Sequence, residues 1–435
     1  MSLTLKNCLL NNQITDVLIK AGLIAKIGKH RDSKEVIDCQ GLVLLPGLID
    51  GHVHFRSPGF EYKEDWLTGS RAAARGGVTT VLDMPNTSPA IIDQESLDAK
   101  RKLVSQKSLV NFGFHFGATA ENISLAREIK GVAGIKVFVG SSTGNLLLNN
   151  PSDLKELFSE SKQLFLVHAE NERLIQEQTE KYKNETNPKI HTEIRAPEAA
   201  ARSVIMLLEL AEQTGARIHF CHVSTAKELE LISQAKQKGL SVTCEVTPHH
   251  LFLTEEEYDK KGNWVKMNPP LRSEKDRQAL WQGIKNGIVD TIGTDHAPHT
   301  REEKEKDYWH APAGVPGVET MLPLLLNAVS QGNLGLERLI QLTSANPARI
   351  FKIKNKGAIK EEYDADLVLV DLNARRRVIE NELETKCGWS PYADRELKGW
   401  PVVTIINGNV VFNKGVFFDK IKGMEIEFLS LKRRG

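Results

Sequence analysis

Two histidines separated by one residue stand at the end of an apolar run near the start of the chain. His52 and His54 lie in the heptapeptide DGHVHFR (residues 50–56), directly after the apolar run GLVLLPGLI. Such a run is typical of a buried strand, and residues two apart on a strand share one face. A lone buried histidine is more often satisfied by backbone or water than by an ion. Because imidazole is the commonest metal ligand, the pair instead predicts a metal site.

Further ligand-type residues follow later apolar runs in the same way. They are His168 in LFLVHAE, His219 and His222 in IHFCHVS, and Asp295, His296 and His299 in TIGTDHAPH. Lys136 stands within GIKVFVG, where burial of its ammonium group is costly unless the group is neutralised or paired. Carboxylation by CO₂ would turn the Lys136 amine into a carbamate, an anionic oxygen ligand that can bridge two cations.

The elements that must position these residues are predicted to alternate between strand and helix. The eight strand candidates are residues 48–55, 77–84, 111–119, 134–140, 163–170, 217–224, 240–247 and 289–296. Segments of helical periodicity separate them, for example 62–77, 196–215 and 225–239. This alternation predicts an α/β fold with a parallel sheet, and eight repeats favour a closed (β/α)₈ TIM-type barrel over residues 50–349.

A closed barrel also predicts how the ligands are divided. Its first and eighth strands are neighbours, so we expect one ion to be held by His52, His54 and Asp295. The fifth and sixth strands are adjacent on the other side, so we expect a second ion at His168 and His222, with Lys136 from the fourth strand as the bridge. Nitrogen and oxygen donors without thiolate fit two Zn²⁺ ions, with Mn²⁺ or Co²⁺ as substitutes.

The two ends of the chain have a different texture. Residues 1–49 and 350–435 alternate in short apolar pieces, and NGN at 407–409 between two apolar runs is a hairpin signal. We expect the two ends to pair into one small β-sandwich beside the barrel.

Composition excludes several classes of function. Lys+Arg is 57 and Asp+Glu is 56, so the balanced charge gives no electrostatic case for nucleic acid or an anionic membrane as a partner. Five scattered cysteines argue against a disulfide framework and fit a reducing compartment. No long apolar segment or secretory signal is seen, and we therefore expect a cytoplasmic enzyme.

The ordered set of motifs resembles the amidohydrolase superfamily and, within it, the dihydroorotases. DGHVHFRSP is similar to the first signature of that family and GTDHAPHTREEK to the second, and MPNT, KMNPPLR and SANPARIF stand where such proteins have them. The resemblance covers roughly residues 40–355. Many bacterial dihydroorotases use an aspartate as the bridging ligand, whereas GIKVFVG resembles the members that use a lysine.

The resemblance implies a role for each matching residue. It implies a binuclear zinc centre on His52, His54, His168, His222, Asp295 and carboxylated Lys136, with a metal-bridging hydroxide as nucleophile and Asp295 as general acid and base. It implies that the substrate is bound by Arg56, Asn86, Asn268, His299, Ala313 and Gly314. The reaction implied is the reversible closure of N-carbamoyl-L-aspartate to L-dihydroorotate plus water, in pyrimidine (UMP) biosynthesis. A homodimer and association with a transcarbamoylase are further expectations.

Two other functions stay open from the sequence. One is another cyclic amidohydrolase, such as an allantoinase or dihydropyrimidinase, whose neutral substrates would leave Arg56 without a carboxylate to bind. The other is a non-catalytic, dihydroorotase-like scaffold, although all six ligand positions carry competent residues.

Several polar residues are expected to have no role in catalysis. We expect His219 to point away from the site, Cys221 to face outward, Glu245 to pair with a loop, and Lys304 to lie on the surface. The charged segment 300–316 is predicted to be a mobile lid over the site.

Overall fold

The computed structural model describes residues 2–31, 33–141 and 146–429. Its larger domain is built around eight parallel strands that follow one another in the sheet in chain order. They are β6 (Leu48–Val53), β7 (Val78–Asp83), β8 (Asn111–Gly117), β9 (Gly134–Phe138), β10 (Leu164–His168), β11 (Arg217–Phe220), β12 (Val242–Val246) and β13 (Thr291–Ile292). An isolated parallel bridge between Val53 and His296 joins β6 to the segment after β13. The sheet is therefore a nearly closed barrel, as predicted.

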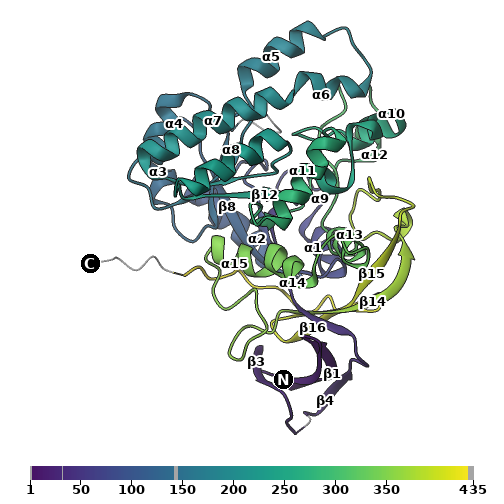
Figure 1. The fold of residues 1–435 in the computed structure, drawn as a ribbon. Coiled ribbons are helices and arrows are strands. Elements are labelled where there is room, and N and C mark those ends of the chain that lie inside the picture. Colours follow the sequence, from purple (N-terminus) through teal and green to yellow (C-terminus); the bar gives the residue numbers. More distant parts are fainter. Residues whose placement is uncertain (1, 32, 142–145, 430–435) are drawn as a thin grey trace.

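Helices connect successive strands and cover the outside of the barrel (Figure 1). The helices are α1 (Trp66–Arg75), α2 (Gln94–Ser105), α3 (Ile123–Glu128), α4 (Pro151–Phe158), α5 (Glu172–Lys181), α6 (His191–Ile194), α7 (Pro197–Thr214), α8 (Ala226–Gln237), α9 (Pro248–Phe252), α10 (Tyr258–Lys261), α11 (Glu274–Lys285), α12 (Arg301–Lys304), α13 (Met321–Ser330), α14 (Leu336–Ile340) and α15 (Asn346–Ile350), with a π-helical turn at Gln341–Ala345 and short 3₁₀ turns at Pro188–Ile190, Glu255–Glu257, Gly262–Val265 and Glu380–Glu382. Local signals set their starts: Asp65 and Thr225 form capping boxes at α1 and α8. Helix α7 ends at Gly215, whose φ of 70° suits glycine.

A separate mixed sheet of nine strands is built from both ends of the chain. Its strands are β1 (Ser2–Leu10), β2 (Gln13–Lys20), β3 (Leu23–Ile27), β4 (Glu35–Asp38), β5 (Val43–Pro46), β14 (Leu367–Arg377), β15 (Glu396–Ile406), β16 (Asn409–Asn413) and β17 (Val416–Phe417). Antiparallel pairing of β14 with β5, with Leu369 opposite Leu44, joins the two ends. The predicted hairpin at 407–409 connects β15 to β16 through Asn407 and Gly408, which have φ of 48° and 76°.

One segment of the C-terminal region leaves this small sheet and packs on the rim of the barrel. We call residues 378–395, between β14 and β15, the strap. Trp389 and Tyr392 of the strap are each 1% exposed and pack with Val265, Met267 and Val315 from the barrel loops. The strap therefore links the small sheet to the loops at the C-terminal ends of the barrel strands.

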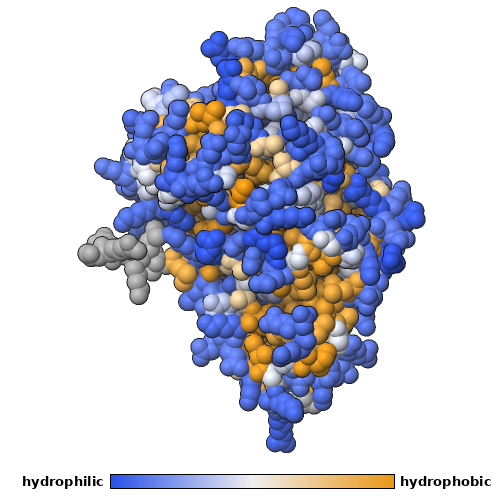
Figure 2. Space-filling model, in the orientation of Figure 1, coloured by the Kyte–Doolittle hydropathy of each residue, from blue (hydrophilic) through white to orange (hydrophobic). Residues whose placement is uncertain are grey.

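The surface is mainly hydrophilic over the barrel helices, with an apolar patch around β16 in the lower half of Figure 2. Among the described residues, no helix combines the length and the apolar character needed to cross a membrane.

Candidate metal centre

The C-terminal ends of the barrel strands bring five predicted ligands into one buried cluster. His52 lies in β6 and His168 ends β10, His54 follows β6, and His222 and Asp295 follow β11 and β13. Each is at most 8% exposed. Positive φ values at His222 (35°) and Asp295 (47°) show that the chain has left strand geometry at both positions. This turn of the backbone is what aims the two side chains into the site.

The first half of the site consists of His52, His54 and Asp295. The Oδ1 atom of Asp295 lies 3.3 Å from His52 Nε2 and 3.0 Å from His54 Nε2. Burial lowers the pKa of His52, but the carboxylates of Glu245 and Asp295 outweigh it and raise that pKa to about 10. Burial lowers the pKa of His54 to about 4. Burial would raise the pKa of Asp295, but the two histidines outweigh it and hold the pKa well below its usual value, so Asp295 is ionised.

The second half of the site consists of His168 and His222. His168 Nδ1 lies 3.0 Å from His222 Nε2, and the two ring centroids are 4.7 Å apart. Burial lowers the pKa of both imidazoles, that of His222 well below its usual value. Both rings are therefore neutral, which is the form that binds a metal. The two halves meet, since ligand atoms of His52, His222 and Asp295 all lie within 4.8 Å of one another.

Lys136 on β9 is fully buried, and its Nζ contacts Cys221, which lies next to His52. Its positive charge acts to lower the pKa of His52, His168 and His222, so it is close to both sets of ligands. Among the described residues no carboxylate pairs with Lys136, and its Nζ lies 3.3 Å from Cys221 Sγ. Cys221 therefore faces the barrel interior, and the prediction that it faces outward is wrong. The alternation of side chains between the two faces of a strand does not extend to Cys221, because β11 ends at Phe220, one residue earlier.

Glu245 on β12 braces both halves, which the sequence interpretation missed. Its Oε1 accepts from His52 Nδ1 at 2.8 Å and from the backbone N–H of His222 at 3.4 Å. Its Oε2 lies 3.9 Å from His219 Nε2, so His219 points into the barrel rather than away from it. Glu245, His52 and Cys221 form a second group of potential ligands around the other face of His52. An acidic residue inside the strand LSVTCEVT was the signal that could have identified this role.

His54 and His168 are also held by hydrogen-bond partners, and these partners lie on loops. His54 Nδ1 donates to Asn86 Oδ1 at 2.7 Å. His168 Nε2 lies 2.9 Å from Glu170 Oε2, and Arg195 donates to the same oxygen at 2.6 Å. Such partners fix the tautomer and orientation of a ligand imidazole. The spacing of His168 and Glu170, two residues apart in HAE, could have indicated this pair.

The donor set fits the binding of a metal such as zinc. The nitrogens that face one another across the site belong to imidazoles, and the pKa values of His54, His168 and His222 are lowered. The nitrogens on the other side of His52, His54 and His168 are already engaged. In the second half, His168 Nδ1 and His222 Nε2 lie close together. In the first half, His52 Nε2 and His54 Nε2 both approach Asp295 Oδ1, so ligand atoms converge in each half.

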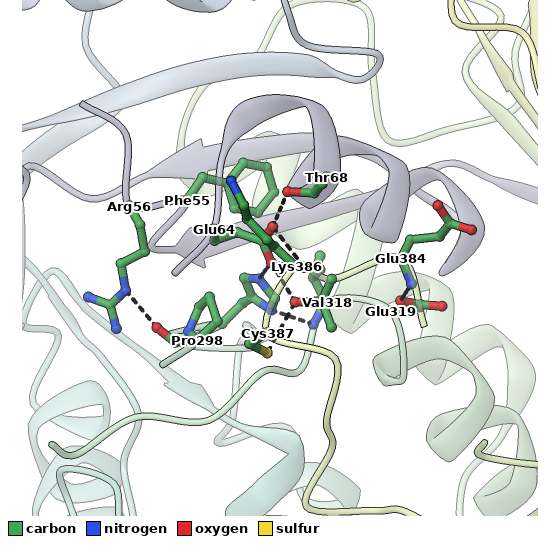
Figure 3. A network of polar contacts seen from close by, with 12 residues as sticks. Phe55, Arg56, Glu64, Thr68, Pro298, Val318, Glu319, Glu384, Lys386 and Cys387 are labelled. Carbon is green, nitrogen blue, oxygen red and sulfur yellow. Dashed lines mark hydrogen bonds and ion pairs between the residues drawn. The ribbon is translucent and has the colours of Figure 1, made fainter. Parts of the chain in front are cut away.

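Arg56 lies beside this centre with its guanidinium buried. It is 3% exposed and has a φ of 61°, so the backbone turns sharply there. Its Nε donates to Pro298 O at 3.1 Å (Figure 3) and its Nη2 lies 3.1 Å from His299 Nε2. Burial lowers the pKa of Arg56 to about 10, so the group stays charged at neutral pH. Among the described residues no carboxylate forms an ion pair with it, and the guanidinium is therefore available to an anionic ligand.

A cavity of about 320 Å³ opens next to the second half of the site. Its lining includes Asn268 and Ala313, both predicted to contact substrate, together with Arg195, Lys266 and Tyr308. Gly314, also predicted to contact substrate, has a φ of 142°, and a Cβ there would meet Ala297 O at 2.4 Å. A side chain at 314 would therefore displace the chain that carries His299.

Lys304 holds the segment around Ala313 in place. Lys304 donates to the carbonyls of Lys266, Pro312 and Gly314 at 3.0–3.1 Å. Lys304 is only 1% exposed, so the prediction that it lies on the surface is wrong. The contact partners are backbone carbonyls, which the sequence does not reveal. The role of segment 300–316 as a lid stays a prediction.

A polar network beside Asp295 connects the strap to this rim (Figure 3). Glu64 is fully buried and accepts hydrogen bonds from Thr68, Thr385 and the backbone N–H of Lys386. Its Oε2 lies 3.4 Å from His296 Nε2. His296 therefore braces the rim and does not face the metal centre.

Comparison with known proteins identifies the family. Residues 43–411 match the Amidohydrolase family. The chain belongs to the amidohydrolase family. Similar relatives include the dihydroorotases of Methanosarcina mazei (40% identical; 92% of this chain, 91% of the relative) and Pyrococcus furiosus (38% identical; 96% and 93%).

Solved structures of other amidohydrolases share the fold. The L-hydantoinase (dihydropyrimidinase) from Arthrobacter aurescens has a TM-score of 0.93 at 30% identity, covering 98% of this chain and 99% of that one. The dihydropyrimidinase from Brevibacillus agri has a TM-score of 0.92 at 27% identity, covering 100% of both chains. This amidohydrolase is a hydrolase of cyclic amides.

Proposed function

We propose that this chain is a dihydroorotase, which interconverts N-carbamoyl-L-aspartate and L-dihydroorotate plus water in pyrimidine synthesis. The observation that carries the proposal is the buried guanidinium of Arg56, which has no carboxylate partner among the described residues. L-Dihydroorotate carries a carboxylate on its ring, and a guanidinium binds a carboxylate through two parallel hydrogen bonds. The names of the relatives support the same substrate.

The proposed cofactors are two Zn²⁺ ions and a CO₂-derived carbamate on Lys136. His52, His54 and Asp295 would hold one ion, and His168 and His222 the other. Lys136 suits the bridging role because it is buried close to both sets of ligands and lacks a carboxylate partner in the described part of the chain. When bound, the ions would lower the pKa of a shared water molecule and polarise the amide carbonyl.

The residues of the chain perform the remaining steps. Asp295 is ionised and would take a proton from the attacking water and deliver it to the departing ring nitrogen. Arg56 and His299 would hold the substrate carboxylate, with Asn86 nearby through its contact with His54. Asn268 and the backbone at Ala313 and Gly314 would contact the ring from the side of the cavity.

The domain limits, location and assembly complete the proposal. We propose residues 50–349 as the catalytic barrel, flanked by 1–49 and 350–435. A cytoplasmic location, a homodimer and association with a transcarbamoylase stay predictions.

A side-by-side hydrolysis assay tests the proposed function. Zinc-loaded protein is given L-dihydroorotate, allantoin or dihydrouracil, and ring opening is followed by ultraviolet absorbance or product analysis. We expect turnover of dihydroorotate to exceed that of the neutral substrates by at least about 100-fold, since a buried charge is left unpaired without the carboxylate. Preference for dihydrouracil or allantoin would favour the hydantoinase-type alternative. No turnover of any substrate by protein that binds two zinc ions would favour the scaffold.

A further inference from the structure

The side chain of His299 is fully buried and each of its two ring nitrogens faces two polar groups. On one side, Nδ1 lies 3.1 Å from Lys63 Nζ and 3.2 Å from Glu303 Oε2. On the other side, Nε2 lies 3.1 Å from Arg56 Nη2 and 3.1 Å from Ala313 O. Each nitrogen therefore faces one group that can only donate a hydrogen bond and one group that can only accept it.

A neutral imidazole cannot satisfy all four of these groups at once. Burial and the charges of Arg56 and Lys63 lower the pKa of His299 well below its usual value, so the ring carries one proton. With that proton on Nδ1, His299 donates to Glu303 and accepts from Arg56. With the proton on Nε2, it donates to Ala313 O and accepts from Lys63. Each tautomer satisfies two of the four groups, and Lys63 and Glu303 together make both tautomers feasible.

We propose that Lys63 and Glu303 are positioning residues that allow His299 to change tautomer when the substrate carboxylate binds. This inference rests on the proposed function. Without substrate, Nδ1–H donates to Glu303 and Nε2 accepts from Arg56. When a carboxylate takes the donors of Arg56, Nε2 loses that bond, and the Nε2–H tautomer then donates to the carboxylate while Nδ1 accepts from Lys63. One proton leaves Nδ1 and one reaches Nε2 by exchange with water, so the net charge of the protein stays the same.

The surroundings hold Lys63 and Glu303 in place. Lys63 Nζ lies 2.9 Å from Glu303 Oε1 and sits 5.3 Å from the ring centre of Tyr62. Glu303 also accepts from the hydroxyl of Tyr62 at 3.2 Å, and α12 begins with a capping box in which Thr300 bonds to Glu303. The pair is therefore arranged before any ligand arrives.

The backbone of His299 is fixed as well. Trp389 of the strap donates from its Nε1 to His299 O at 2.7 Å. Because the backbone is held and the ring is buried, a change of tautomer is the way in which His299 can respond to a new partner without moving. The stretch FEYKEDW (residues 60–66), which leads into α1, thereby contributes to the carboxylate site.

The first test is spectroscopic. Full-length, zinc-loaded protein is labelled with ¹⁵N-histidine, and the His299 signals are assigned by their absence in His299→Gln. We expect Nδ1 to carry the proton in free protein, and Nε2 to carry it with an equilibrium mixture of dihydroorotate and N-carbamoyl-L-aspartate. Lys63→Met should keep the proton on Nδ1 in both states. The same tautomer with and without ligand in the unmodified protein would overturn the inference.

The second test is kinetic. Lys63→Met is expected to raise KM for dihydroorotate about 10- to 100-fold, the loss of one charge-assisted hydrogen bond, with kcat changed less than about threefold. Lys63→Arg, which keeps a cationic donor, should recover at least half of the loss on a logarithmic scale. Lys386→Met is the matched control, because Lys386 bonds to Glu61 O and Asp65 in the same stretch without touching His299.

The outcomes separate the two proposals. An unchanged KM in Lys63→Met, or an equal rise in Lys386→Met, would overturn the role of Lys63 and leave the proposed function standing. Failure of the unmodified protein to hydrolyse dihydroorotate while it hydrolyses a neutral cyclic amide would overturn the proposed function, and this inference with it.

Discussion

The two halves of the metal centre differ in how much charge they carry before any ion binds. In the first half, Asp295 stands between His52 and His54, and the carboxylates raise the pKa of His52 to about 10. In the second half, His168 and His222 face each other as neutral rings, and no carboxylate of the described residues lies between them.

This difference assigns a distinct task to Lys136. In the first half, Asp295 contacts both histidines on the side that faces the site. In the second half, the nearest carboxylate, Glu170, contacts only the outer nitrogen of His168. A carbamate on Lys136 would add an anionic oxygen on the inner side of the second half, and this is why a buried lysine is compatible with a dication site. The second-half ion is accordingly expected to depend on Lys136 far more than the first-half ion does.

The largest effect is expected from Asp295→Asn in the first half. The amide cannot accept a proton or provide a charge for the ion, so kcat should fall at least about 1,000-fold. The measurement is steady-state hydrolysis with zinc content determined on the same sample. Retention of more than a tenth of the kcat would remove Asp295 from proton transfer.

Lys136→Gln is expected to affect the second half alone. The glutamine cannot be carboxylated, so zinc content should fall from two ions to about one per chain, with the first-half ion retained. Elemental analysis after dialysis against a weak chelator provides the count. Two ions held equally tightly by Lys136→Gln would show that the second half does not need a modified lysine.

A smaller effect is expected from Glu170 and Glu245, which contact the ligand histidines on the side away from the site. Glu170→Gln and Glu245→Gln should each weaken zinc affinity about 10- to 100-fold, because both carboxylates orient ligand histidines. Only Glu170 is paired with a buried arginine, Arg195, and leaving that charge unpaired should also cost about 3–5 kcal/mol of unfolding free energy. Competition titration and denaturant unfolding of the metal-free proteins measure the two effects, and equal loss of stability in both variants would contradict the difference.

The smallest effect on zinc binding and turnover is expected at a buried carboxylate that touches neither half. Burial raises the pKa of Glu319 to about 8, despite the opposing effect of Arg75. Between its unfolded pKa, about 4.3, and about 8 the folded state binds the extra proton, so the unfolding free energy contributed by Glu319 should fall as pH rises, by up to about 1.4 kcal/mol per pH unit. Glu319→Gln should flatten this slope in unfolding measured from pH 5 to pH 9. An identical slope in both proteins would show that Glu319 is ionised throughout.

The sequence predicted much of the barrel because its signals are local. Apolar β-branched runs and helix caps place each strand and helix, and residues at strand ends must then meet at one edge of the sheet. This is why the meeting of His52, His54, His168, His222 and Asp295 in one cluster could be predicted.

The residues that the sequence did not reveal depend on long-range contacts. Glu245 and Cys221 point inward because β11 and β12 end where they do, and the φ of 35° at His222 breaks the alternation. Lys304 is buried against backbone carbonyls, and Trp389 reaches His299 from the strap. Apart from the acidic residue inside the strand LSVTCEVT, none of these contacts has a signature in the sequence.

Arg56→Ala tests whether Arg56 selects a cyclic amide that bears a carboxylate. The measurement is kcat/KM for L-dihydroorotate and for dihydrouracil in both proteins, with zinc content determined in parallel. We predict that Arg56→Ala keeps two ions per chain, loses at least about 100-fold in kcat/KM for dihydroorotate, and changes dihydrouracil hydrolysis less than about threefold. An unchanged ratio between the two substrates, with both ions present, would contradict this role of Arg56.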